Sequence, residues 1–264
     1  SLMRYFKSIV NARYPNFSHG YNYLLIQKNK THDWAVEDFE LDELCRGGGL
    51  LMNESIGNAS AGWTFDQIVT NLQADGDVCR ERGGFYLGIS FGSRNPPRDE
   101  IIESALWAAA GCRPYNTAMT RNVRRYCTRY SQYTFDERMR RLTRPEEVLA
   151  PQSKTSLWWQ PFVYETPLEN SKRKLVVNLL NIPRKATRPP REGDIKPKYD
   201  MPPGTAPVAF KLTLPKGMKA AGAHLITPET LEVIELPLQD DRLTVPAVAV
   251  WRVLVVDLTV GKGA

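Results

Sequence analysis

Apolar and polar residues alternate along the first half of the chain with two periods, one typical of helices and one typical of strands. Residues 3–10 carry apolar side chains at helical spacing, and residues 17–26 form a short apolar and aromatic run that predicts a strand. A polar, acidic stretch at residues 31–49 follows, and its glycine-rich end predicts the stop of a helix. The apolar run LLMNES at residues 50–55 predicts the second strand.

The clearest helical pattern begins at a capping box. Thr64 and Gln67 have the spacing at which a hydroxyl and an amide exchange hydrogen bonds with the backbone of the first turn. Gly83 and Gly84 end the pattern, as glycines commonly do after a helix. The residues that we expect on the buried face are Phe65, Ile68, Val69, Leu72 and Cys79.

Further alternation extends to about residue 142. Residues 84–92 predict a strand, 98–111 a helix, 112–117 a short strand, and about 122–142 a final helix. Strands and helices that alternate in this way, with connections too long for hairpins, predict a parallel sheet with helices outside it.

The pattern changes after about residue 150. Apolar runs separated by Pro, Gly and Asp replace the helical spacing, and short strands of this kind predict an antiparallel sandwich. The Pro-rich residues 183–207 are interpreted as a long loop within that sandwich. The predicted class is therefore α/β plus all-β, with domains at 1–150 and 151–264. The predicted strands are 156–165, 174–181, 208–215, 220–226, 230–238, 242–247 and 249–258.

Composition indicates an ordinary folded protein. The chain has 264 residues, of which 42% are hydrophobic and 24% charged, and no apolar run approaches the roughly 20 residues that cross a bilayer. The net charge is +6, but the basic residues are divided between a helical segment and the Pro-rich loop, and no nucleic-acid motif accompanies them. A solvated basic face is therefore favoured over nucleic-acid binding. The helical group is Arg121, Arg124, Arg125, Arg129, Arg138, Arg140 and Arg141.

Motifs for metals, cofactors and targeting are lacking in the sequence. The four cysteines are widely separated, so buried thiols are favoured over a zinc or redox site, which weakly favours a reducing, cytoplasmic compartment. No GxGxxG, P-loop, GxSxG or HExxH pattern occurs, and we expect no cofactor and no metal. The chain opens on Ser-Leu without a signal-peptide pattern, so we expect a processed product, an engineered piece or part of a longer protein.

Polar side chains cluster where the predicted parallel strands end, which is where β/α barrels place reactive groups. Glu54 follows an apolar strand, and burial there would raise the pKa of its carboxyl group toward that of a general acid. An equally weighted interpretation is a carboxylate that caps a backbone group or pairs with an Arg. Trp63 could stack on a sugar ring or only cover an edge. The other candidates at strand ends are His19, Tyr21, Asn22, Asn53, Ser90, Tyr115 and Asn116.

Several stretches read together resemble the C-terminal half of dextranase-like proteins, the family 66 glycoside hydrolases and their uncharacterised relatives. LLMNES looks like the strand that presents the acid/base glutamate, and the β-domain strands look similar at KLVVNLLN, AGAHLITPE and LTVPAVAVWRVLVV. The late barrel helices look similar at IIESALWAAAGCRPYN and NVRRYCTRYSQYTFDERMRRL.

This resemblance implies that residues 1–150 are the second half of a TIM (β/α)8-type barrel, about four strands, followed by a β-sandwich at 151–264. Glu54 would be the general acid/base at the sixth strand. The family's nucleophilic Asp, at the end of the fourth strand, has no counterpart here. Three explanations stay open: a fragment, pairing with another half-barrel, or a protein that has lost catalysis. An unpaired half-barrel would expose two sheet edges and favour self-association. The implied sugar-binding residues are Tyr21, Asn22, Asn53, Trp63, Ser90, Tyr115 and Asn116.

The leading hypothesis is a glycoside-hydrolase-like protein that acts on α-glucan or a related polysaccharide. Glycoside hydrolysis normally uses two carboxylates, and the acidic residues 33–43 are favoured as a solvated helix face rather than as the second one. The main alternative is a non-catalytic carbohydrate-binding or scaffolding protein derived from a glycosidase. A weaker alternative is an anion- or nucleic-acid-binding protein that works through the Arg-rich helix.

Overall fold

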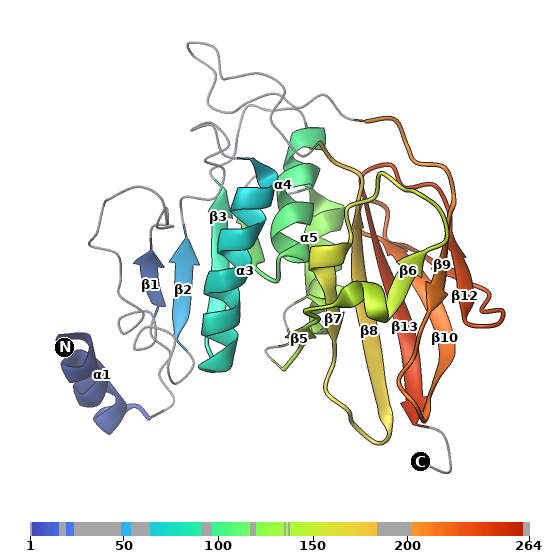
Figure 1. Cartoon of the computed structure of the whole chain (residues 1–264). Helices are drawn as coiled ribbons and strands as arrows, with labels where there is room; N and C mark the ends of the chain where they lie inside the picture. The colour runs from blue at the N-terminus through green and yellow to red at the C-terminus, as the bar shows by residue number, and fades with distance from the viewer. Residues whose placement is uncertain are drawn as a thin grey trace.

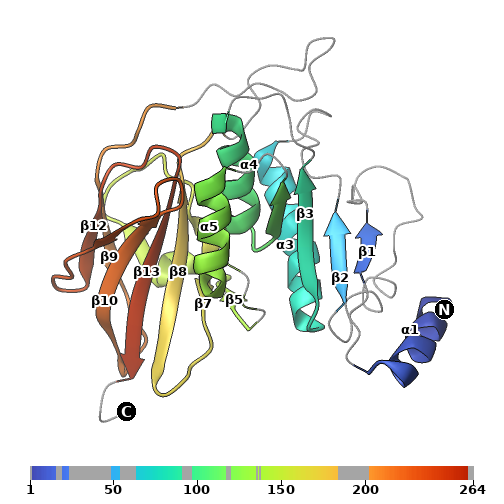
Figure 2. The ribbon, with the colours of Figure 1, turned by 180° about the vertical axis from the view of Figure 1, so that it is seen from behind.

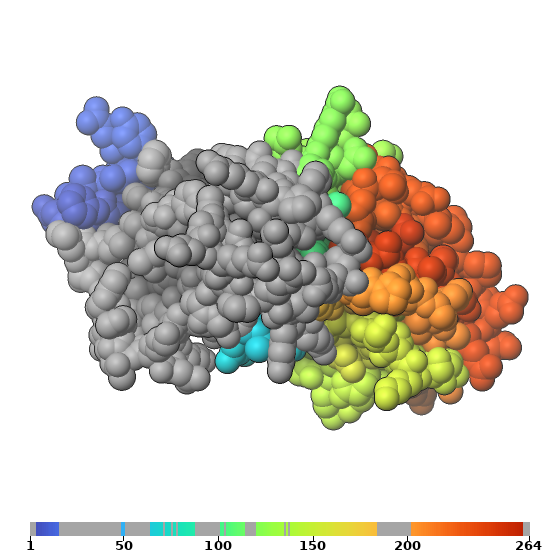
Figure 3. Space-filling view, turned by 90° about the horizontal axis from the view of Figure 1, so that it is seen from above, coloured from blue at the N-terminus to red at the C-terminus, as the bar shows by residue number. Residues whose placement is uncertain are grey.

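The structure is a computed structural model, and its layers follow one another along the molecule (Figure 1). A parallel sheet lies nearest helix α1 (Leu2–Arg13), a layer of helices follows it, and two antiparallel sheets lie at the other end. Seen from above, α1 and the last sheets again occupy opposite ends of the molecule (Figure 3). The described residues are 2–15, 20–23, 49–53, 64–90, 97–116, 120–134, 136, 138–183 and 202–260.

The first sheet contains four strands in the order β1-β2-β3-β4, and all neighbouring pairs are parallel. The predicted parallel arrangement is therefore confirmed. Among the described strands, β1 and β4 are the edges, so the closed eight-stranded barrel, and this sheet as half of it, stays a prediction. The strand bounds are β1 Gly20–Tyr23, β2 Leu50–Asn53, β3 Phe85–Ser90 and β4 Arg113–Asn116.

Helix α3 (Phe65–Glu81) forms as the capping box predicts. The backbone N–H of Thr64 donates to Gln67 Oε1 at 2.9 Å, and the backbone N–H of Gln67 donates to Thr64 Oγ1 at 3.3 Å. All five residues predicted for its apolar face are buried. Helix α4 (Pro97–Ala109) follows β3, and its apolar spacing predicts five inward residues. Ile102, Ala105, Leu106 and Ala109 are buried, whereas Ile101 is half-buried and packs against the same core.

Helix α5 (Arg121–Arg129) is shorter than the sequence predicts, and the expected helix up to residue 142 is wrong. After Arg129 the chain makes a 3₁₀ turn, η2 (Ser131–Tyr133), and then strand β5 (Arg140–Arg141). Met139 enters the core, and β5 pairs with a later strand. Tertiary burial and strand pairing have overridden a local helical pattern, as they often do for a weak propensity.

The two antiparallel sheets confirm the predicted sandwich. One sheet has six strands in the order β11-β10-β13-β8-β7-β5, and the other has three in the order β12-β9-β6. The predicted strand at 156–165 is wrong in its first part, because Pro161 has no backbone N–H to donate and the chain forms the 3₁₀ turn η4 (Gln160–Phe162). Another 3₁₀ turn is η3 (Pro145–Glu147). The bounds are β6 Leu149–Pro151, β7 Val163–Glu165, β8 Lys172–Leu180, β9 Val208–Leu212, β10 Met218–Thr227, β11 Glu232–Glu235, β12 Arg242–Val245 and β13 Trp251–Val260.

The six-stranded sheet is buried on both faces, which explains the near-continuous apolar runs of β8 and β13. In β8, Leu175, Val177 and Leu179 face the three-stranded sheet, whereas Val176 and Leu180 belong to the core beneath the helices. Figure 2 shows α5 and α4 lying between this sheet and the parallel sheet. Strands buried on one face only would alternate apolar and polar residues, so the helix layer accounts for the pattern.

The helix layer and the sandwich share one continuous apolar core, which holds Phe65 and Leu106 together with Trp158 and Trp251. Strands β5 and β6 begin before residue 151 and already pair with later strands. The division into domains at residues 150 and 151 stays a prediction. Residues 184–201, most of the expected Pro-rich loop, lie outside the described residues, and no described helix is long and apolar enough to span a bilayer.

Candidate functional site

The carboxyl ends of the four parallel strands lie at one edge of the first sheet (Figure 1). In the register of the sheet, Tyr23 pairs with Asn53, and Asn53 pairs with Gly88. Ser90 pairs with Asn116 two residues further along. The predicted sugar-binding residues of these strands therefore fall within the last three residues of their strands: Tyr21, Asn22, Asn53, Ser90, Tyr115 and Asn116.

Glu54, the predicted acid/base, is the next residue in the sequence after the last residue of β2, and it lies outside the described residues. Trp63 and His19 also lie outside the described residues. The backbone register thus brings six of the predicted residues to one edge, while the role of Glu54 stays a prediction.

The face of the parallel sheet opposite the helices is less buried at β3 than the face that the helices cover. Tyr86 is buried on the helix side, whereas its neighbours Phe85 and Leu87 are half-buried. The guanidinium carbon of Arg113 lies 4.6 Å from the centroid of the Phe85 ring, a cation–π distance. Phe85 and Arg113 therefore place an aromatic ring and a cation together on this face of the sheet.

A cavity of about 670 Å³ opens on the other side of the helix layer. Its walls come from the segment after α5, the β7–β8 hairpin and the end of β13. Its volume falls in the range that binds small ligands in proteins. The polar and aromatic lining includes Tyr133, Asp136, Arg138, Glu169, Lys174 and Asp257.

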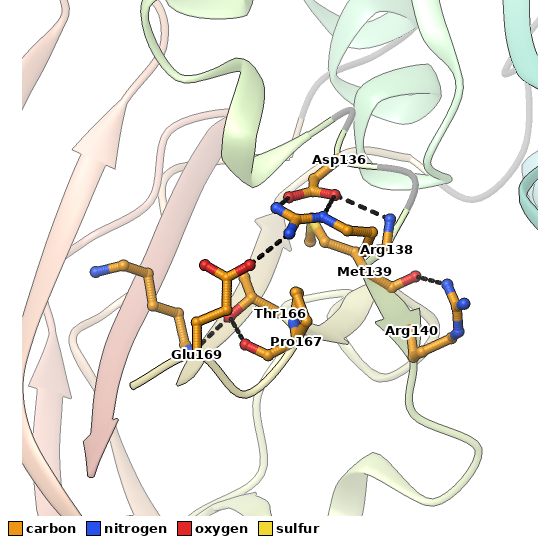
Figure 4. Close-up of polar contacts among 8 residues, drawn as sticks. Asp136, Arg138, Met139, Arg140, Thr166, Pro167 and Glu169 are labelled. Carbon is orange, nitrogen blue, oxygen red and sulfur yellow. Dashed lines mark hydrogen bonds and ion pairs between the residues drawn. The ribbon is translucent and has the colours of Figure 1, made fainter. Parts of the chain in front are cut away.

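Arg138 joins two carboxylates at this cavity (Figure 4). Its Nε and Nη2 donate to Asp136 at 3.0 and 2.7 Å, and its Nη1 donates to Glu169. The hydrogen bonds from Arg138 lower the pKa of Asp136, and the same bonds raise the pKa of Arg138. Asp136 is therefore a carboxylate at neutral pH and does not serve as a general acid.

Lys174 forms the second charged group of the cavity. Burial opposes its charge, but the hydrogen bond that it donates to Asp257 raises its pKa overall. Its Nζ also lies 5.8 Å from the centroid of the Tyr133 ring. The cavity thus presents ionised acceptors, cationic donors and one aromatic ring, which suits a ligand rich in hydroxyl groups.

Sequence reasoning missed this cavity. Tyr133, Asp136 and Arg138 fall within the segment that was expected to be helical, and Lys174 and Asp257 belong to strands that were read for their apolar residues. The one available signal was Asp257, a charge that interrupts an otherwise apolar run.

Glu229 is a carboxyl group whose pKa is raised, mainly by burial. Its Oε1 accepts a hydrogen bond from the backbone N–H of Trp251 at 3.2 Å, and its carbonyl oxygen accepts one from Asn122 Nδ2 at 2.8 Å. These bonds join α5 to the β10–β11 turn and to β13, which is a structural role.

Thiol chemistry is disfavoured for the described cysteines. Cys79 and Cys112 are buried as predicted, and burial raises the pKa of Cys127 to about 12, so that its thiol stays protonated at neutral pH. Within the described ranges, no group of three or more His, Cys, Asp or Glu side chains could hold a metal ion.

Comparison with known proteins gives distant structural neighbours only. No family model matches the sequence, and no curated protein matches it either. One similar structure is a cycloisomaltooligosaccharide glucanotransferase of a Paenibacillus species in complex with cycloisomaltoheptaose, with 14% identity and a TM-score of 0.44. Another is the noncanonic maltogenic alpha-amylase AmyB from Thermotoga neapolitana, with 10% identity and a TM-score of 0.39.

The two alignments differ in extent. The first covers 62% of this chain and 27% of the glucanotransferase, and the second covers 98% of this chain and 66% of the amylase. The chain therefore spans less than two thirds of the length of either neighbour. The names of both neighbours describe enzymes that act on glycosides. This chain resembles them only distantly, and the resemblance is one of fold.

Proposed function

We propose that the chain is the glycoside-hydrolase-like part of a carbohydrate-active protein, with its site at the carboxyl edge of the parallel sheet. The observation that supports this proposal is the shared edge at which β1, β2, β3 and β4 end, because β/α enzymes place their reactive groups there. Amide, hydroxyl and phenol groups at that edge would bind sugar hydroxyls. The substrate class proposed is an α-glucan or a related polysaccharide.

Glu54 would act as general acid/base in this site. It would protonate the glycosidic oxygen as the leaving group departs, and it would later remove a proton from water. The reaction needs a second carboxylate, and the family resemblance assigns no residue among positions 1–264 to that role. A retaining mechanism would therefore require a carboxylate from upstream sequence or from a partner half-barrel.

The test compares two substrates in a protein that includes the upstream sequence. An α-glucan has a poor leaving group that needs protonation, whereas a dinitrophenyl α-glucoside has a leaving group that departs without it. We expect Glu54→Gln to lower kcat/KM on the α-glucan by about 10²- to 10⁴-fold. The first, bond-breaking step on the dinitrophenyl glucoside should be nearly unchanged.

Glu81→Gln is the matched control, because Glu81 is an exposed carboxylate at the end of α3, with 65% of its side chain accessible. This variant should retain the wild-type rate on both substrates. Equal rates for Glu54→Gln and wild type on the α-glucan would remove Glu54 from the mechanism.

A second candidate function is non-catalytic carbohydrate binding at the cavity between the segment after α5 and the β7–β8 hairpin. The observation that favours it is the combination of the Tyr133 ring with charge-paired Asp136 and Asp257 in one opening of about 670 Å³. Under this alternative, Arg138→Gln would weaken oligosaccharide binding by about tenfold, because the exposed guanidinium group would no longer donate charged hydrogen bonds to sugar hydroxyls. Glu54→Gln would leave the same affinity unchanged, and no hydrolysis would be seen in the longer protein.

A further inference from the structure

Helix α5 lies on the side of the molecule that Figure 2 turns toward the viewer, and it carries several exposed arginines. A cavity of about 530 Å³ lies on this face, between the helix and the β10–β11 turn. The cavity is lined by five residues of this nine-residue helix, four of them arginines, and by Leu231 of the turn. The arginines are Arg121, Arg124, Arg125 and Arg129, and all four are exposed.

The local electrostatics of this face are unfavourable for the protein alone. Arg121 and Arg125, and likewise Arg125 and Arg129, are four residues apart, the spacing at which like charges destabilise a helix. Arg121 also places a cation in the first turn, where the helix dipole favours anions, and no acidic residue is present in that turn. Among the described residues, none of these four arginines forms an ion pair. A bound anion would offset the repulsion among these cations and would interact favourably with the helix dipole.

The walls of this cavity are held in place from beneath. Val123 and Tyr126 are buried, and the Tyr126 ring meets Trp251 edge-on at a centroid distance of 5.0 Å. Asn122 Nδ2 donates to the carbonyl oxygen of Glu229 at 2.8 Å, which fixes the β10–β11 turn against the helix. The arginine side chains therefore project from a rigid support.

The turn itself carries backbone strain at the cavity. Leu231 has φ of +64°, in the left-handed region that non-glycine residues rarely adopt. Its backbone N–H donates to the carbonyl oxygen of Thr227 at 2.7 Å, which closes the turn. This left-handed residue closes the turn, as is common in hairpin loops, and brings Leu231 to the wall of the cavity.

We propose that this cavity binds a small molecule that carries two or more phosphate or sulfate groups. Guanidinium forks match tetrahedral oxyanions, and the arginines are spaced along the helix so that several could contact separate groups of one ligand. The lining contains no aromatic ring on which bases could stack, and the volume suits a small ligand. Both facts favour a compact polyanion over a nucleic-acid strand, and this site is independent of the proposed sugar site.

The experiment titrates the protein with tripolyphosphate and with sucrose octasulfate by calorimetry at two salt concentrations. The double variant Arg124→Gln/Arg125→Gln should lower the affinity for whichever of the two ligands wild type binds more tightly. We expect a loss of about tenfold or more, because charged hydrogen bonds are lost. Arg124→Lys/Arg125→Lys keeps the charge but loses the forks, so its affinity should lie between those of wild type and the glutamine variant.

Lys216→Gln/Lys219→Gln is the matched control, because it removes the same charge from exposed positions in the β9–β10 connection and at the start of β10. The control should bind as wild type does, and thermal unfolding should show that each variant is folded. Equal loss in the control, or no loss in Arg124→Gln/Arg125→Gln, would overturn the proposal. An oligothymidylate that binds tighter than both polyanions through the same arginines would overturn it in favour of nucleic acid.

Discussion

Tyr164 donates a hydrogen bond from its phenol to the backbone carbonyl oxygen of Ala109 at 2.7 Å, and both residues are buried. Ala109 is the last residue of α4, so its carbonyl group has no partner within the helix. Tyr164 belongs to β7 in the six-stranded sheet. One bond thus satisfies a helix end and joins the helix layer to the sandwich.

Replacing Tyr164 by Phe should destabilise the protein by about 1–3 kcal/mol, because a buried carbonyl group loses its partner while the ring is retained. Urea unfolding would measure the free-energy difference. Tyr130→Phe is the control, since Tyr130 is only half-buried, and it should change stability by less than about 0.5 kcal/mol. Equal stabilities of the Tyr164 variant and wild type would show that water or another donor replaces the bond.

Two glycines with positive φ provide a matched pair for the contact between α3 and the end of α4. Gly83 has φ of +72° and open space around an added Cβ, whereas Gly111 has φ of +79° and would place a Cβ 2.5 Å from Arg80 Nη1. Arg80 donates to the Gly111 carbonyl oxygen at 3.1 Å and to Asp77 at 2.9 Å, so it cannot move without losing those bonds.

We therefore expect Gly83→Ala to lower the free energy of unfolding by about 1 kcal/mol, from backbone strain alone. Gly111→Ala should cost about 1–3 kcal/mol more, since the added methyl displaces a partly buried guanidinium group. Denaturant unfolding of both variants tests the difference, and similar losses in the two would mean that Arg80 relocates freely.

Acid should remove the contribution of Asp136 to stability. Because Arg138 lowers the pKa of Asp136 in the folded protein, the ionised carboxylate stabilises the fold at pH values above the unfolded pKa of about 3.9. That contribution is lost as the pH falls through the lower folded value. The difference in unfolding free energy between wild type and Asp136→Asn should therefore be constant from pH 5 to 7 and shrink below about pH 4.

A double-mutant cycle assigns this effect to its cause. In an Arg138→Gln background, Asp136→Asn should have much less pH-dependent effect on unfolding, since the group that lowers the pKa is gone. An undiminished pH dependence in that background would show that another group controls Asp136.

The turn between Gln239 and Arg242 should accept glycine with a gain in stability. Asp240 and Asp241 have φ of +50° and +58°, the conformation of a type I′ hairpin turn, in which the second position favours glycine. Asp241→Gly should stabilise the protein by about 1 kcal/mol, measured as a rise in Tm. Thr244→Gly in β12, at an exposed strand position, is the control and should lower Tm.

Local signals in the sequence were reliable where one short-range interaction decides the structure. The capping pair Thr64 and Gln67 begins α3 as expected, and the apolar spacing identifies its buried face. The signal was misleading between Ser131 and Arg141, where Met139 enters the core and β5 pairs with β7. That pairing joins segments more than 20 residues apart, so no local pattern could report it.

The sequence alone determined the alternation of strands and helices, the parallel first sheet and the antiparallel strands behind it, because side-chain periodicity follows backbone geometry. It also identified the polar residues that share the carboxyl edge of the parallel sheet. Only the tertiary structure decided which face of the six-stranded sheet the helices cover, and it alone joined Tyr133, Arg138, Glu169 and Asp257 around one cavity. Those residues lie on three separate segments, and packing rather than local propensity brings them together.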